Sequence, residues 1–163
     1  MQITRATDYA TRVMIFLASL PPAAKAQSAA IARATEVPTS FLSKVMQRLV
    51  SAGLVASSRG SGGGFGLAVA RGRITMLDIL ETFEGETRLN LCLTHGPSCN
   101  RKSRCPAHAV WEEAQRALVA VLRQASLEKL VQGALSRVCH SERSEESALV
   151  RRTGTADPSG SLP

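Results

Sequence analysis

Apolar residues recur at helical spacing in the first third of the chain. Over residues 4–20 they follow a three- and four-residue period that stops at a Pro-Pro pair, which predicts a first helix. An Ala-rich segment over residues 27–34 predicts a second helix. Pro38 marks the start of a third helix, which we expect over residues 38–52. Two short helices joined by a few residues are typical of a helix-turn-helix.

The third predicted helix has one apolar face and one polar face. We expect the apolar stripe to pack inward, and it consists of Phe41, Leu42, Val45, Met46, Leu49 and Val50. The opposite face carries Thr39, Ser40, Ser43, Lys44, Gln47 and Arg48. These hydroxyls, amide and cations can bind phosphates and base edges, and no acid lies among them to repel a duplex. The pattern therefore predicts a DNA-recognition helix.

Two short apolar segments, residues 54–56 and 66–69, flank the glycine-rich stretch SSRGSGGGF and predict a β-hairpin. A hairpin that follows a helix-turn-helix is typical of a winged helix. The alternative interpretation is a nucleotide phosphate loop, but neither GxxxxGK followed by Ser or Thr nor GxGxxG is present. We expect the glycines to let the backbone approach DNA closely and Arg59 to enter a narrow minor groove.

The second half of the chain predicts two further helices. Residues 74–83 form a short amphipathic pattern, and a longer apolar stripe begins at Pro106 and continues weakly to about residue 131. A lone helix of this length cannot bury its own stripe, so we expect it to pack on the winged helix-turn-helix domain of residues 1–73 (the head), on a second copy or on both. The residues after 133, which include Cys139, have the composition of a disordered tail.

We therefore expect a mainly α fold with a small β-wing. Its parts are a winged helix-turn-helix domain at residues 1–73, a cysteine loop with dimerisation helices at residues 74–133, and a disordered tail at residues 134–163.

The placement of charge supports a nucleic-acid partner. The 163-residue chain has a formal net charge of +7, and residues 1–73 hold nine Lys and Arg against two acids, whereas the later parts are balanced. Such concentration favours a phosphate-binding surface, although a basic face without a partner is the alternative. The chain has neither a signal-peptide pattern nor an apolar run of roughly 18 residues, so we expect a cytoplasmic protein without membrane contact.

Three of the four cysteines lie in the stretch CLTHGPSCNRKSRCPAH, residues 92–108. Clustered cysteines in a reducing compartment are more often metal ligands or redox groups than disulfides. Thiolates suit iron-sulfur clusters and zinc alike, but gaps of six and five residues are wider than structural zinc usually takes, which favours a cluster. Zinc and an unligated thiol switch stay open, and His95 is a competing ligand. Because no CxxC motif is present, we expect no enzyme.

Several segments together resemble the IscR/NsrR family of bacterial iron-sulfur transcription regulators. They are TDYATRVMIFLA (7–18), VPTSFLSKVMQRLVSAGLVASSRGSGGGFGLA (37–68), ITMLDILETFEG (74–85) and the pattern C-x6-C-x5-C. The resemblance implies a homodimeric repressor that binds double-stranded DNA at a roughly palindromic operator. It also implies an iron-sulfur cluster, 2Fe–2S or 4Fe–4S, that senses cluster or iron supply, nitric oxide or redox state.

The resemblance further implies roles for individual residues. DNA contacts fall on Ser40, Lys44, Gln47 and Arg48 of the recognition helix and on Arg59 of the wing, and cluster ligands fall on Cys92, Cys99 and Cys105. The fourth ligand is His108 by resemblance to the iron-sulfur-biogenesis branch, or Asp8 from the other subunit by resemblance to the nitric-oxide-sensing branch. The first cysteine gap is one residue longer than in the best-known members.

Overall fold

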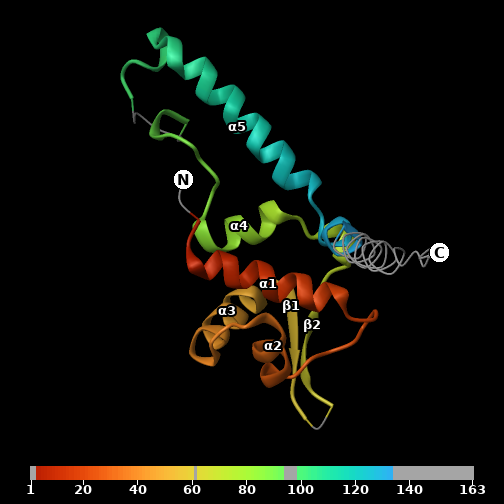
Figure 1. The fold of residues 1–163 in the computed structure, drawn as a ribbon. Helices are drawn as coiled ribbons and strands as arrows, with labels where there is room; N and C mark the ends of the chain where they lie inside the picture. The colour runs from red at the N-terminus through yellow and green to blue at the C-terminus, as the bar shows by residue number, and fades with distance from the viewer. Residues whose placement is uncertain (1–2, 61, 94–98, 134–163) are drawn as a thin grey trace, which may run out of the picture. The chain divides into compact units, whose positions relative to one another are not determined.

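The computed structural model describes residues 3–60, 62–93 and 99–133 (Figure 1). In chain order its elements are α1 (Arg5–Ser19), α2 (Ser28–Thr35), α3 (Thr39–Ser51), β1 (Val55–Ser58), β2 (Gly64–Leu67), η1 (Arg71–Arg73), α4 (Met76–Glu84), η2 (Leu91–Leu93), η3 (Lys102–Arg104) and α5 (Pro106–Gln124). The expected mainly α fold with a two-stranded wing is confirmed. The predicted tail with Cys139, and His95, lie outside the described residues.

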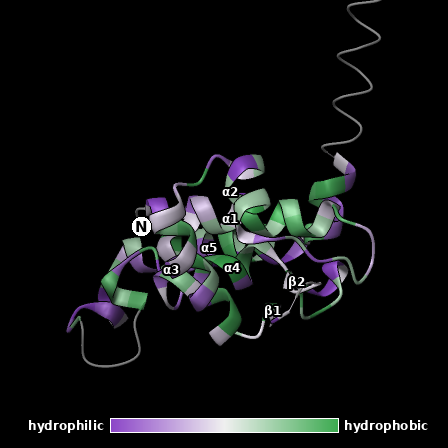
Figure 2. Ribbon diagram, turned by 90° about the horizontal axis from the view of Figure 1, so that it is seen from below, coloured by the Kyte–Doolittle hydropathy of each residue, from purple (hydrophilic) through white to green (hydrophobic). Residues whose placement is uncertain are grey.

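Helix α1 forms the centre of the core in the unit Met1–Val131, because α2, α3 and α4 all pack against it. The stripe read from the sequence is the buried side of this helix, and Ala10, Val13 and Met14 are fully buried. They pack with apolar residues of the helix-turn-helix, of α4 and of the segment after α5, among them Ile31, Leu42, Leu49, Ile79 and Leu127. Figure 2 shows the helices with both green apolar and purple polar stretches, as amphipathic helices require.

A tight turn joins α2 to α3. Glu36 follows α2 with φ 56°, a left-handed conformation that reverses the chain within one residue. The buried Thr35 hydroxyl donates to the Ile31 carbonyl at 2.7 Å, one turn back along α2, so it has a partner within its own helix. Val37 is buried just beyond the turn, so the start of α3 is held against the core.

The wing strands β1 and β2 are antiparallel, with Val55 opposite Leu67 and Ser58 opposite Gly64. A third segment covers the outer edge of β2, because Ala26 and Phe65 exchange two backbone hydrogen bonds of 2.9 Å. A Cβ added at Gly64, which has φ +150°, would lie 2.7 Å from the Ala26 carbonyl oxygen. Gly64 therefore serves packing within the wing, a role that the sequence interpretation of these glycines did not include.

The end of α5 is joined to the start of α4 by backbone hydrogen bonds. Met76 N–H donates to the Ala125 carbonyl and Leu127 N–H donates to the Ile74 carbonyl, both at 2.9 Å. This bridge interrupts the predicted continuous helix at residues 125–126, and helical backbone resumes over residues 127–133. Leu127 is fully buried. We call this connection between residues 74–76 and 125–127 the strap.

At the start of α4, Thr75 and Asp78 form a reciprocal capping box: each side chain accepts a backbone N–H from the other residue. The helix consequently has a fixed beginning directly beside the strap. Across the described part of the chain, no helix combines the length and the apolar content needed to cross a membrane.

Candidate functional site

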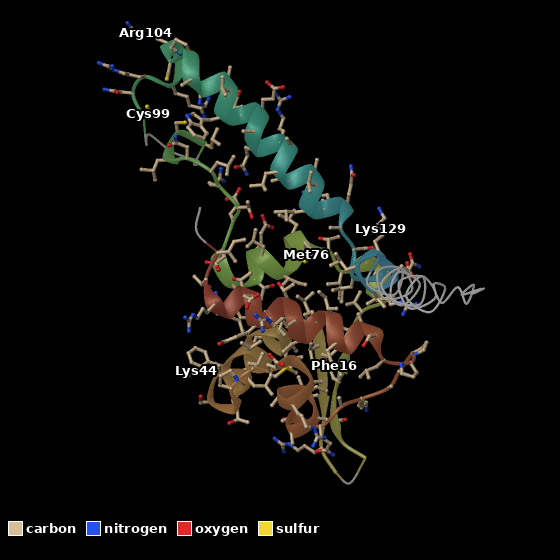
Figure 3. All side chains as sticks on the ribbon, viewed as in Figure 1. Phe16, Lys44, Met76, Cys99, Arg104 and Lys129 are labelled. Atoms are coloured by element: carbon tan, nitrogen blue, oxygen red, sulfur yellow. The ribbon has the colours of Figure 1, made fainter. Side chains whose placement is uncertain are left out.

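The polar face of α3 is exposed as predicted. Ser40, Lys44, Gln47 and Arg48 are all exposed, whereas Leu42, Val45, Met46 and Leu49 on the opposite face are buried. The Ser43 hydroxyl is occupied locally, because it donates to the Thr39 carbonyl at 3.2 Å. Figure 3 labels Lys44 on the outer side of α3. The arrangement leaves one hydroxyl, one amide and two cations directed away from the core.

Phe41 departs from the prediction. It was expected in the inward stripe, but 48% of its surface is exposed. Its ring meets the Tyr9 ring of α1 edge-on, with centroids 5.8 Å apart and planes at 70°. The reason is geometric. The six positions of the stripe span a wider arc of the helix than the core covers, so the residues at the two edges of the stripe are left partly exposed. The half-buried Val50 lies at the other edge.

Arg48 differs from Lys44 although the two residues lie one turn apart. The Arg48 guanidinium lies over the Phe83 ring of α4, 5.2 Å from its centroid. The same charge lowers the pKa of the neighbouring Glu84, as a smaller contribution than the hydrogen bonds that this carboxylate accepts. Arg48 therefore connects α3 to α4 in addition to lying on the predicted reading face.

Glu84 was not singled out from the sequence, yet it ties the end of α4 to the start of α1. Its carboxylate accepts a hydrogen bond from the Thr7 hydroxyl, from the Thr4 hydroxyl at 2.7 Å and from the Thr4 N–H at 3.0 Å. Donation from Thr7, then from Thr4, holds the pKa of Glu84 below its usual range. No spacing rule predicts this contact, since the partners are about 80 residues apart.

Arg59 directly follows β1, at the base of the wing tip. It is exposed, and it belongs to no ion pair within the described residues. Gly60 has φ +107°, and neither Gly60 nor Gly62 has an atom within 4 Å of an added Cβ. Unlike Gly64, these two glycines stand in open space.

The three loop cysteines are free thiols, and each is half-buried. Cys92 lies in η2, Cys99 precedes η3, and Cys105 is the N-cap residue of α5. Figure 3 labels Cys99 in the loop that leads to α5. Over the residues that the structure describes, which omit 94–98, no group of three or more His, Cys, Asp or Glu side chains converges so as to hold a metal ion. The structure thus places the thiols on one loop without drawing them together.

His108 in the first turn of α5 carries the clearest sign of a missing partner. Its side chain is 13% exposed, and its Nδ1 is buried without a hydrogen-bond partner. Its Nε2 lies 3.4 Å from a Glu112 carboxylate oxygen, and its backbone N–H donates to the Cys105 carbonyl at 3.0 Å. A buried nitrogen without a partner costs free energy, so it suits a residue that donates its lone pair to another group. Thiolates and imidazole are ligand types that iron-sulfur clusters accept, but the described side chains do not converge on one point.

Asp8, the alternative fourth ligand, lies on α1 and is about half exposed. Its carboxylate forms an ion pair of 2.8 Å with Arg12 one turn later, and the Arg12 guanidinium lies 5.9 Å from the centre of the Tyr9 ring. Within one described chain Asp8 joins no group with the cysteines.

Two residues that the sequence did not identify fix the segment that leads into the cysteine loop, residues 86–93. The Gln115 side chain on α5 accepts from the Leu89 N–H at 2.9 Å and donates to the Thr87 carbonyl. Arg88 pairs with Glu86 and donates to the Leu93 carbonyl directly after Cys92. A glutamine within an apolar helical stripe was the available signal for the first of these contacts.

Helix α5 exposes apolar residues along one side. Val110 and Val121 are 65% and 66% exposed, and Ala117 between them is exposed as well. Together with Ala114, these residues recur at spacings of four, three and four and define what we call the apolar face of α5. None of the residues of this described helix is fully buried.

Comparison with known proteins identifies relatives over nearly the same residues. The profile of the Rrf2 family, described as "Iron-dependent Transcriptional regulator", matches residues 3–133. The transcriptional regulator NsrR of Bacillus subtilis is 32% identical over 132 residues, covering 80% of this chain and 90% of the relative. The regulator IscR of Xenorhabdus nematophila is 29% identical over 131 residues, covering 80% and 79%.

A solved structure has a similar fold. The structure titled CymR, the global cysteine regulator of B. subtilis, superposes with a TM-score of 0.67 at 25% identity, covering 81% of this chain and 97% of that one.

Proposed function

The chain belongs to the Rrf2 family of transcriptional regulators, and from this premise we propose that it is a homodimeric repressor whose binding to a roughly palindromic operator is controlled by an iron-sulfur cluster on residues 92–108. DNA binding and transcription regulation follow from membership of the family. The cluster, the signal, the dimer and the residue roles are the proposal.

The head supplies the DNA-binding surface in this proposal. Ser40, Lys44 and Gln47 are exposed on α3 and no acid interrupts them, while Arg59 stands at the wing. In a helix-turn-helix the second helix enters the major groove, and a wing tip can reach the neighbouring minor groove. We assign Lys44 and Arg59 to phosphate or groove contacts and Ser40 and Gln47 to base edges, with Arg48 contributing from the side of α4.

The cysteine loop supplies the cluster site. Cys92, Cys99 and Cys105 are the proposed thiolate ligands, and the unpartnered Nδ1 of His108 is the observation that favours His108 over Asp8 of the partner subunit as the fourth ligand. When bound, the cluster supplies iron–thiolate bonds that are sensitive to oxidation, iron supply and nitric oxide. Gln115 ties the chain before Cys92 to α5, and Arg88 ties Leu93 to the same segment, so a change in the loop would act on α5.

The apolar face of α5 supplies the dimer interface. Exposed Val110 and Val121 on one helix face are costly in water, and pairing of two copies would bury them. A change in the loop would alter the position of α5, and the strap would pass this change to α4, which packs directly on α1 of the head. The two heads of a dimer would thereby change spacing between two states of different operator affinity.

Spectroscopy of the full-length protein tests this proposal. Protein purified without oxygen should be coloured, with visible absorption that air or nitric oxide bleaches, and its affinity for DNA should change on bleaching. H108A should alter the spectrum, whereas D8A should leave it unchanged. A colourless protein that contains stoichiometric zinc would contradict the sensor function and favour a zinc-stapled DNA-binding module.

A cysteine thiol switch is the second candidate, and one specific observation favours it. The superposable CymR structure is titled a global cysteine regulator, and the three described thiols of this chain are half-buried and free. A colourless, metal-free protein whose DNA affinity responds to mild oxidant and recovers with thiol reductant would select this function over the cluster.

A further inference from the structure

Phe41 is a large apolar side chain in the first turn of a helix whose outward face is otherwise polar. It is the third residue of α3, and nearly half of its surface is open to water. Single exposed apolar residues are common and need no function by themselves. Two further observations, the fixing of its ring and its place on the helix, give this one a role.

The Phe41 ring is held in place although it is exposed. The Tyr9 ring meets it edge-on at 5.8 Å, and Tyr9 is itself half-buried beneath the Arg12 guanidinium. The 2.8 Å ion pair with Asp8 fixes Arg12 in turn. Aromatic pairs in this geometry contribute stability beyond the area they bury, so the ring presents a defined surface to solvent. A ring ordered in this way can contact a ligand without losing further side-chain entropy.

The position of Phe41 on α3 determines what the ring can meet. Residues at the N-terminal end of a recognition helix contact base edges in the major groove. Phe41 lies one turn before the exposed Lys44, so the two side chains share one side of the helix. The apolar group that a base pair offers in the major groove is the C5 methyl of thymine, and a phenyl ring is one of the side chains that contact it.

We propose that Phe41 is a specificity-determining residue that recognises the C5 methyl group of a thymine in each half-site of the operator. This assignment rests on the proposed DNA-binding function and adds to it a base preference. Neighbouring Lys44 holds the phosphate backbone, and the hydroxyl of Ser40 is left to a polar base edge.

The probe for the test is a duplex selected from a randomised library by the full-length wild-type protein. Each thymine of the selected site is then replaced singly by deoxyuridine, which removes only the methyl group. In wild type, one thymine in each half-site should show about fourfold weaker binding on replacement, the effect of taking one methyl group out of an apolar contact. F41A should show no penalty at that thymine, and selection with F41A should lose the thymine preference there.

Three further variants complete the design. F41Q removes the apolar ring but keeps a long side chain, and should behave as F41A does. F41Y keeps the ring and should retain the deoxyuridine penalty. S51A changes another exposed residue on the same helix, at its far end, and should match wild type throughout.

The possible outcomes distinguish a failure of thymine recognition by Phe41 from a failure of DNA binding itself. If F41A and F41Q keep the wild-type deoxyuridine penalty at every position, Phe41 does not recognise a thymine methyl group, although the protein binds DNA. If wild type enriches no sequence from the library, the proposed DNA-binding function fails and the assignment fails with it.

Discussion

Neighbouring side chains on α3 have different surroundings, and this decides what each can contribute. Lys44 is exposed and directed away from the core, whereas Arg48 one turn later lies over the Phe83 ring. A lysine on a free face acts on a phosphate as a point charge. An arginine that also stacks on an aromatic ring stabilises the fold as well as any ligand. The two cations therefore differ: Lys44 is free to act on a ligand alone, whereas Arg48 also stabilises the contact between α3 and α4.

We expect K44A and R48A to differ in stability but to resemble each other in DNA binding. K44A should weaken binding to all sequences alike and reduce the salt dependence by about one counterion, with unchanged thermal stability. R48A should additionally lower the free energy of unfolding by about 0.5–1 kcal/mol, because the contact with Phe83 is lost. Salt-dependent fluorescence anisotropy and urea denaturation measure the two effects. Equal stability of both variants would contradict the role given to Phe83.

Glu84 makes the connection between α4 and α1 sensitive to acid. Because hydrogen bonds from Thr7 and Thr4 lower the pKa of Glu84 below its usual 4.5, its stabilising contribution is present above that pH and is lost as the pH falls further. E84Q should therefore be less stable than wild type at pH 7, by roughly 0.5–1 kcal/mol since the site is near solvent. The difference should shrink below pH 4.5. Urea denaturation across this range measures it, and a constant difference would exclude this origin.

At the scale of elements, hydrophobic periodicity located the helices well but not their edges or contacts. The stripes of α1 and α3 predicted which residues are buried, since local spacing alone defines a helical face. The exposure of Phe41 depends on how much of α3 the neighbouring helices cover, and the break at residues 125–126 depends on a bridge to Thr75. Both arise between segments far apart in sequence. The same is true of the site: spacing identified the cysteines, but it did not predict that Gln115 binds the backbone of residues 87–89.

The glycines of the wing divide into two kinds that sequence cannot distinguish. G64A should destabilise the protein by about 1–3 kcal/mol, because the position has φ +150° and an added Cβ would lie 2.7 Å from the Ala26 carbonyl oxygen. G62A is the matched control, since its Cβ would meet nothing within 4 Å, and it should change stability by less than about 0.5 kcal/mol. Thermal denaturation compares the two. Similar melting temperatures would show that the segment at Ala26 can move away from β2 at little cost in stability.

At the scale of the whole molecule, charge and apolar surface are separated along the chain. The surplus of seven positive charges belongs to residues 1–73, whereas the apolar face of α5 belongs to the balanced part. A protein that binds a polyanion through one part and a second copy through another would have this division. Helix α4 connects the two parts, because the strap joins its start to the end of α5 and α4 itself packs on α1.

The apolar face of α5 gives the last prediction. V121E places a charge where two copies would bury a valine, and a charge buried without a partner costs several kcal/mol, so the variant should sediment as a single chain while wild type sediments as a dimer. Loss of the second head should weaken operator binding roughly 10²-fold, because the two half-sites are no longer bound together. A120E introduces the same charge at the preceding residue, outside the apolar face, and should stay dimeric. If V121E remains a dimer in sedimentation velocity, the interface lies elsewhere, and α5 must use its exposed valines for a different partner.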